Sequence, residues 1–386
     1  MYPNLSYFFK DVFGIDVALP IQTYGFFVAL AFIIGIWILK IEFKRKEKEG
    51  ILQSIKRKNL IGEPAKPKEL VISGIVGFIV GYKLLDAILN YSTFTDNPQT
   101  FILSTSGNFL GGIIGAAISV FFTWREKNKS KLTPPKWIET DIFPHQITGN
   151  ILMVAAIFGI LGAKLFHNLE NFDELIADPI GSLFSFSGLT FLGGAIVGST
   201  AVIIYAKRYN IKPLHLLDVA AIGLPLAYAV GRLGCQISGD GCWGVENLHP
   251  QPEWLSWLPS WTWSSTYPHN VVNEGGLIDM CTGKHCHALN NPVWPTSLYE
   301  STLNVIIFGF LFLIRKRIKV AGMLFSIYLI LGGVERFLME LIRVNNLYHI
   351  FGFGVTQAEI ISVLMIIAGI TGIFLTFKYK EKLKSY

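Results

Sequence analysis

Apolar runs long enough to cross a lipid bilayer recur along the whole chain, and they constrain its fold more than any other feature. A helix needs about 20 residues to span a hydrocarbon core of about 30 Å. Backbone polar groups in lipid must satisfy one another, and the alternation over about 10 residues that marks an outer-membrane barrel is not seen. The sequence predicts an all-α, polytopic membrane protein, a single membrane domain over residues 1–386, with about nine transmembrane helices at residues 20–40, 70–90, 108–125, 149–167, 190–206, 215–237, 298–315, 321–341 and 352–377.

Composition supports this class and excludes others. Hydrophobic residues make up 51% of the chain and charged residues 16%, with a mean hydropathy of +0.46. One water-soluble core cannot bury such an apolar excess. The formal net charge of +6 does not indicate nucleic acid binding, because the basic residues are gathered in alternate connectors between the apolar segments. The expected partner is therefore the lipid bilayer, with no nucleic acid.

The alternation of charge predicts the orientation. The stretch from Lys40 to Lys68 holds ten Lys or Arg, whereas connectors 91–106, 168–189 and 239–297 hold one, Lys284. Because cytoplasmic loops are enriched in Lys and Arg, we expect the N-terminus outside and the C-terminus in the cytoplasm. The long loop at residues 239–293 is then an external loop or cap, which either lies at the membrane interface or has its own small core.

An internal repeat is visible at an offset of 81 to 82 residues. Each copy is predicted to hold a helix that carries a Lys, an external loop without basic residues and a second helix that starts at Gly-Gly. Both copies have the same topology, so residues 70–125 and 150–207 are interpreted as a parallel duplication of a helix pair. The matching segments are Gly81-Tyr82-Lys83-Leu84 with Gly162-Ala163-Lys164-Leu165, and Ser106-Gly107 and Phe109–Gly112 with Ser187-Gly188 and Phe191–Gly194.

Charged side chains inside apolar spans are the candidate site residues, since each costs roughly 2.5–3.5 kcal/mol or more in lipid. Arg232 and Arg336 are both expected in the outer half of the membrane, where two guanidiniums suit a phospholipid phosphate. In the structural alternative each arginine pairs with a carboxylate, and Glu340 lies close enough in sequence to neutralise both Arg336 and Arg343. The full set is Lys83, Asp86, Lys164, Asp218, Arg232, Glu300, Glu335, Arg336, Glu340 and Arg343. Asp218, near a cytoplasmic helix end, is interpreted as structural.

The segment from Gly231 to Gly244 is the strongest local signal. Five glycines in 14 residues surround Arg232 and Asp240, and such a segment can present backbone N–H groups to an anion. All four cysteines, Cys235, Cys242, Cys281 and Cys286, fall on or beside the external loop, which permits three disulfide pairings. A zinc site that uses His285 or His287, and a nucleophilic Cys235, are weaker alternatives. We expect no metal and no cofactor.

Taken together, these motifs resemble the prolipoprotein diacylglyceryl transferases of bacteria. The resemblance runs in order from residue 1 to about 377. Leu192 stands where that family has the His of His-Gly-Gly, Cys235 replaces an Asn, Trp294 replaces a His and Gly332 replaces a Tyr. The matching motifs are Tyr24-Gly25, Ser187 to Gly194, the series Asp218, Pro225 and Gly231-Arg232-Leu233-Gly234, then Pro295 with Leu298-Tyr299-Glu300, and Arg336-Phe337 with Glu340 and Arg343.

The resemblance implies a multi-pass enzyme of the bacterial plasma (inner) membrane. Its reaction would move a diacylglyceryl group from phosphatidylglycerol to the lipobox cysteine of an exported prolipoprotein, with glycerol phosphate as the leaving group. The alternative is a catalytically silent lipid-binding or export-associated protein on the same fold. Implied catalytic residues are Arg232, Arg336, Tyr24 and Asp240, the last as a substitute base for the missing histidine. Implied substrate-binding residues are Arg232, Gly231, Gly234, Glu340, Arg343, Gly193 and Gly194.

Overall fold

The computed structural model of the protein describes residues 1–386 except 180–181, 183–189, 346–347, 351–352 and 385–386. The structure is mostly helical, as expected for a polytopic membrane protein. Its chain divides into two compact units. One comprises Met1–Pro3, Thr23–Ile55 and Phe143–Tyr386, and the other comprises Asn4–Gln22 and Lys56–Ile142.

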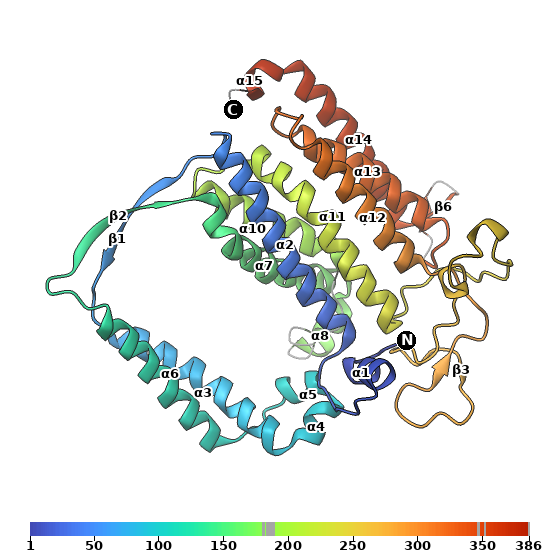
Figure 1. The fold of residues 1–386 in the computed structure, drawn as a ribbon, viewed down its shortest axis with the longest axis horizontal. Coiled ribbons are helices and arrows are strands. Elements are labelled where there is room, and N and C mark those ends of the chain that lie inside the picture. The colour runs from blue at the N-terminus through green and yellow to red at the C-terminus, as the bar shows by residue number, and fades with distance from the viewer. Residues whose placement is uncertain (180–181, 183–189, 346–347, 351–352, 385–386) are drawn as a thin grey trace. The chain divides into compact units, whose positions relative to one another are not determined.

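The larger unit contains most of the long helices (Figure 1). They are α2 (Thr23–Lys48), α7 (Thr148–Glu170), α10 (Phe191–Lys207), α11 (Pro213–Ser238), α12 (Thr296–Ile314), α13 (Met323–Glu340) and α14 (Gln357–Lys378). Its short elements are α8 (Phe172–Ala177), α15 (Lys380–Lys384), and the strand pairs β3 (Gly276–Leu277) with β4 (His287–Ala288) and β5 (Tyr348–Ile350) with β6 (Phe353–Val355).

The smaller unit is built on one pair of long helices. Helices α3 (Pro67–Leu89) and α6 (Phe109–Lys129) pack along each other. The two paired strands of a two-stranded sheet precede α3 and follow α6. The remaining elements of this unit are α1 (Leu5–Phe13), α4 (Tyr91–Asp96), α5 (Pro98–Leu103), β1 (Ile55–Ile61) and β2 (Lys136–Ile142).

Each apolar segment predicted from the sequence coincides over most of its length with a helix, but the segment 352–377 begins in strand β6 (Phe353–Val355), and its helix α14 starts only at Gln357. Within the described residues, seven helices are long and apolar enough to cross a membrane. Helix α10, with 17 residues, is shorter, and α13 carries Glu335, Arg336 and Glu340 within its 18 residues. These two helices nonetheless coincide with expected segments 190–206 and 321–341.

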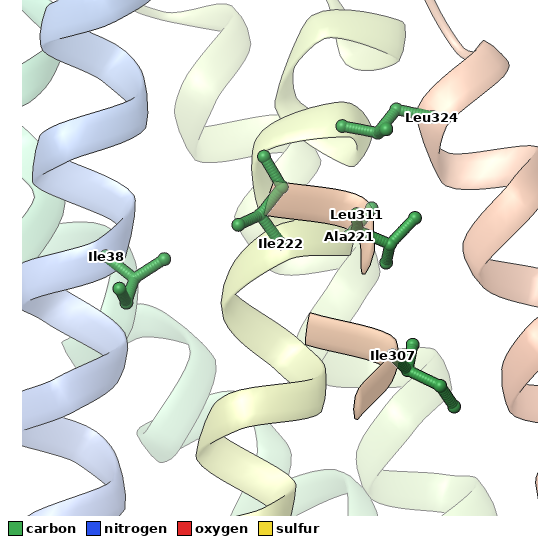
Figure 2. Close-up of a cluster of buried hydrophobic side chains, with 6 residues drawn as sticks. All are labelled: Ile38, Ala221, Ile222, Ile307, Leu311 and Leu324. Atoms are coloured by element: carbon green, nitrogen blue, oxygen red, sulfur yellow. The ribbon is translucent and has the colours of Figure 1, made fainter. Parts of the chain in front are cut away.

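Helix α11 is the centre of the larger unit, because it contacts α2 on one side and α12 and α13 on the other. Its apolar residues Ala221 and Ile222 are fully buried there. Figure 2 shows them between Ile38 of α2 and the side chains Ile307 and Leu311 of α12. Burial of these aliphatic groups fixes the helix that carries Arg232 against the helix that carries Glu300.

Asp218 has the structural role that the sequence suggested. Its carboxylate accepts the backbone N–H of Gly322 at 3.0 Å and of Phe325 at 3.1 Å, at the start of α13. Lys46 of α2 lies 3.5 Å from the same carboxylate. A carboxylate at a helix N-terminus satisfies otherwise unpaired N–H groups, so Asp218 fixes α13 to α11.

The two predicted helix pairs make the same glycine contact, each within its own unit. A Cβ atom built on Gly162 of α7 would lie 2.5 Å from the carbonyl oxygen of Gly193 on α10. In the smaller unit, a Cβ atom on Gly111 of α6 would lie 2.5 Å from the carbonyl oxygen of Gly81 on α3. Both pairs therefore depend on glycine for close helix approach. The matching Ser187-Gly188 segment lies outside the described residues.

The loop at 239–293 has a small core of its own. Trp243, Tyr267 and Val293 are buried together, and the Tyr267 hydroxyl donates to Gln236 Oε1 of α11 at 2.7 Å. A disulfide joins Cys281 to Cys286. This bond occupies both thiols of the zinc site considered from the sequence, so that alternative is wrong.

Candidate functional site

A single buried carboxylate, Glu300, organises the charged residues of the larger unit. Glu300 lies in the second turn of α12 and is 0% exposed. It forms ion pairs with three arginines: its Oε2 contacts Arg232 Nε, and its Oε1 lies 3.0 Å from Arg336 Nη1 and 3.1 Å from Arg343 Nη1. A buried charge requires such partners, and Glu300 thereby draws together arginines from distant parts of the chain.

Helix α13 adds a second carboxylate to this cluster. Glu340 Oε2 pairs with Arg336 Nη2 at 2.9 Å, one helical turn away, and Glu340 Oε1 accepts from Asn345 at 2.6 Å. The expectation that Glu340 would also neutralise Arg343 is wrong, because Arg343 pairs with Glu300 instead. Three guanidiniums and two carboxylates form these ion pairs, and a third carboxyl group, Glu335, lies in the same cavity without joining them.

The three arginines line one cavity of about 500 Å³ within the larger unit. Nη2 of Arg232 is buried and has no hydrogen-bond partner in the described part of the chain, so this donor is not used up by the protein's own hydrogen bonds. The cavity wall also includes apolar side chains that suit an acyl chain. Its lining residues are Glu170, Thr190, Phe191, Leu192, Tyr228, Arg232, Asn304, Tyr328, Gly332, Glu335, Arg336, Arg343, Gln357, Ala358, Ile361 and Met365.

None of the predicted glycines is among the described residues that line this cavity. Gly193 packs α10 on α7, where an added Cβ would lie 2.5 Å from the carbonyl oxygen of Gly162, and Gly194 faces the carbonyl oxygen of Gly159. A Cβ on Gly234 would lie 2.7 Å from Phe27 Cβ of α2, whereas Gly231 has open space around it. The predicted Tyr24, at the start of α2, is 46% exposed.

Asp240 lies in a separate group with two free thiols. The ligand atoms of Cys235, Asp240 and Cys242 all lie within 4.8 Å of one another, and Cys242 N–H donates to Asp240 Oδ1 at 3.2 Å. Arg232 Nη1 lies 3.4 Å from Cys235 Sγ, so Arg232 connects this group to the cavity. The hydrogen bond with Cys235 lowers the pKa of the Cys242 thiol to about 6.

Reasoning from the sequence identified the arginines but missed the residue that assembles them. The sequence marks Glu300 as an intramembrane charge and as part of a Leu-Tyr-Glu motif, but gives no sign that it belongs to the arginine site. Its partners lie 68, 36 and 43 residues away in the chain, which local spacing cannot reveal. Tyr228 and Asn304 line the cavity and were also missed; an uncharged polar residue within a span gives only a weak signal.

Comparison with known proteins is consistent with this geometry. The sequence model of the family described as prolipoprotein diacylglyceryl transferase matches residues 10–142 and 136–375. The phosphatidylglycerol–prolipoprotein diacylglyceryl transferase of Leptospira interrogans is 24% identical over 321 residues, which cover 71% of this chain and 87% of the relative. The proteins of the same name from Clostridioides difficile strain 630 and Clostridium botulinum strain Hall are 30% and 32% identical; the alignments cover 61% and 60% of this chain, and 80% and 81% of the relatives.

Proposed function

The chain belongs to the prolipoprotein diacylglyceryl transferase family, and from this membership and the site geometry we propose its reaction in detail. It transfers the diacylglyceryl group of phosphatidylglycerol to the lipobox cysteine thiol of an exported prolipoprotein. This is the first step of lipoprotein maturation. The observation that carries the proposal is the shared cavity of Arg232, Arg336 and Arg343.

The reaction requires an anion site beside an apolar pocket. A thiolate attacks the glyceryl carbon that bears the phosphate, the C–O bond breaks, and negative charge develops on the departing glycerol phosphate. Fixed guanidinium groups stabilise such charge best where water is excluded. Arg232 and Arg336, held in place by buried Glu300, are proposed to bind the phosphate, and Arg343 supports them.

The other predicted residues have supporting roles in the proposal. Glu340 orients Arg336 through its ion pair. Gly193 and Gly194 allow α10 to approach α7, which positions Thr190 to Leu192 at the cavity. Gly234 allows α11 to approach α2, and open space at Gly231 admits substrate. Tyr24 is proposed to shape the entrance, and Asp240 stays a predicted base at the group of thiols.

The topology is also proposed. The chain is a multi-pass bacterial membrane protein, and we place it in the plasma (inner) membrane. We propose nine spans, namely the seven helices that are long and apolar enough to cross a membrane together with α10 and α13. The basic connectors support a cytoplasmic C-terminus and an external loop at 239–293. The two helix pairs at 70–125 and 150–207 are proposed to be a duplication, supported by their matching glycine contacts.

The test is transfer of radiolabelled diacylglyceryl from phosphatidylglycerol to a lipobox peptide by the purified full-length protein. We expect incorporation by the wild type and a loss of at least about 100-fold with Arg232→Ala, as for removal of an electrostatic transition-state contact. A wild type that binds phosphatidylglycerol but transfers nothing would support the silent lipid-binding alternative, for which Leu192 in place of a histidine is the motivating observation. Transfer that survives Arg232→Ala would refute only the site assignment.

A further inference from the structure

Glu335 is a buried carboxyl group that the ion-pair network leaves out. It lies on α13 next to Arg336, lines the cavity and is 7% exposed. Its Oε1 atom is buried and has no hydrogen-bond partner in the part of the chain that the structure describes. A buried polar atom without a partner is uncommon in native proteins and calls for a reason.

Glu335 is not buried in order to neutralise an arginine. Arg336, the nearest arginine in sequence, directs Nη1 to Glu300 and Nη2 to Glu340. Arg232 and Arg343 also pair with Glu300. Among the described ion pairs of the cluster, every arginine therefore has a carboxylate without Glu335. Asn304 of α12 hydrogen-bonds the Glu335 carboxyl group, but the Oε1 atom is left without a partner among the described residues.

The cavity otherwise lacks a suitable base among the described residues. No histidine is among the described residues that line it, and Leu192 stands where the family resemblance implies one. The other carboxylate among its lining residues, Glu170, is exposed at the end of α7. A buried carboxylate accepts a proton more readily than a hydrated one.

We propose that Glu335 is the general base that deprotonates the lipobox thiol, a role that rests on the proposed transferase function. The thiol proton moves to Glu335 Oε1 as the sulfur attacks the glyceryl carbon. The C–S bond forms, the C–O bond breaks, and its electron pair leaves with glycerol phosphate beside Arg232 and Arg336. The proton then passes from Glu335 to the released phosphate monoester, which restores the carboxylate and closes the balance.

Neighbouring charged groups determine how readily the Glu335 carboxylate takes up a proton. Uptake of a proton there is favoured by an anionic phosphodiester and opposed by the neighbouring guanidiniums. The titratable and charged groups that face it are Arg232 and Tyr228 of α11, Glu300 of α12, and Tyr328 and Arg336 of α13.

The test compares Glu335→Gln with wild type in the radiolabel transfer assay, together with the affinity for a fluorescent phosphatidylglycerol. We expect kcat to fall at least about 100-fold, the typical contribution of a general base, while KM and lipid affinity change less than about threefold. The defect should shrink above a pH of about 8.5, where a free thiol ionises without help.

Adding Leu192→His to Glu335→Gln should restore part of kcat, because both residues line the same cavity. Glu126→Gln, at an exposed site on α6, is the matched control.

Several results would overturn the assignment. One is a kcat of Glu335→Gln within about threefold of wild type; another is a defect of this variant that is confined to KM or that persists unchanged at high pH. A third is loss of the pH dependence of transfer in Glu170→Gln or Asp240→Asn instead of in Glu335→Gln. If Glu335→Gln does not fold, as judged by its lipid affinity, Glu335→Asp decides: a base requires a changed pH profile for this variant, and an unchanged profile refutes the role. Absence of transfer by the wild type itself would instead refute the proposed function, and the base with it.

Discussion

Glu300 shows how one residue can organise a charged site in a membrane protein. A carboxylate at 0% exposure is tolerated because Arg232, Arg336 and Arg343 surround it. The same contacts hold the arginines in fixed positions before any lipid arrives, which is the condition for electrostatic stabilisation of a transition state. The carboxylate thus serves the site without lining the cavity.

Removal of the Glu300 charge should therefore be severe. Glu300→Gln leaves buried guanidinium groups without compensation, for which we expect a loss of about 3–5 kcal/mol in the free energy of unfolding. Thermal unfolding in detergent measures this. The matched control is Glu139→Gln, which removes the exposed pair with Lys58 and should cost less than about 1 kcal/mol. Equal effects of the two variants would contradict the central role of Glu300.

Cys242 is expected to be unusually reactive. The pKa of its thiol is lowered from 9.0 to about 6, chiefly by the hydrogen bond with Cys235. The thiolate fraction, and with it the rate of maleimide labelling at Cys242, should rise with pH through a midpoint near 6. In Cys235→Ala the hydrogen bond is lost and the midpoint should move upward, toward the ordinary value. A midpoint near 9 in both proteins would show that the contact has no such effect.

At the scale of the elements, small residues decide which helices approach closely. The sequence predicted the helices and the Gly-Gly repeats because hydropathy and glycine spacing are local properties. It could not predict that Glu300 lies between α11 and α13, since that contact depends on how Ala221, Ile222 and Ile307 pack. The sequence predicts a structural role for Asp218, but it does not predict that its partners are the backbone N–H groups at the start of α13.

Gly193→Ala tests the helix contact beside the site. The added methyl would lie 2.5 Å from the Gly162 carbonyl oxygen, so α10 must move away from α7, and we expect a loss of about 1–3 kcal/mol from overpacking. Gly149→Ala on α7, where nothing lies within 4 Å, is the matched control and should change stability by less than about 0.5 kcal/mol. Thermal unfolding in detergent compares them. An unaffected Gly193→Ala would argue against the close contact.

At the scale of the whole molecule, the distribution of charge is the basis of the proposed orientation. Basic residues concentrate in alternate connectors, and the loop with the Cys281–Cys286 disulfide falls on the side predicted to be external, where disulfides persist. In the proposed orientation, the arginine cluster would face the outer leaflet, on the side where exported proteins arrive. These assignments agree with one another but come from separate properties of the chain.

The orientation can be tested by labelling in intact spheroplasts. A membrane-impermeant maleimide should label Leu277→Cys, which lies in the loop at 76% exposure, without permeabilisation. It should label exposed Gln53→Cys, beside the basic segment after α2, only after permeabilisation. Both variants are made in a background without Cys242. The opposite pattern would invert the proposed topology.

The central claim is that Arg232 and Arg336 bind one lipid phosphate, and a double-mutant cycle tests it most directly. Binding of phosphatidylglycerol is measured for wild type, Arg232→Lys, Arg336→Lys and the double variant, since lysine keeps the charge but loses the bidentate geometry. We expect a coupling energy of about 1 kcal/mol or more for phosphatidylglycerol and none for uncharged diacylglycerol. This difference would exclude coupling through Glu300 alone. Additive effects for phosphatidylglycerol, or equal coupling for both lipids, would contradict it.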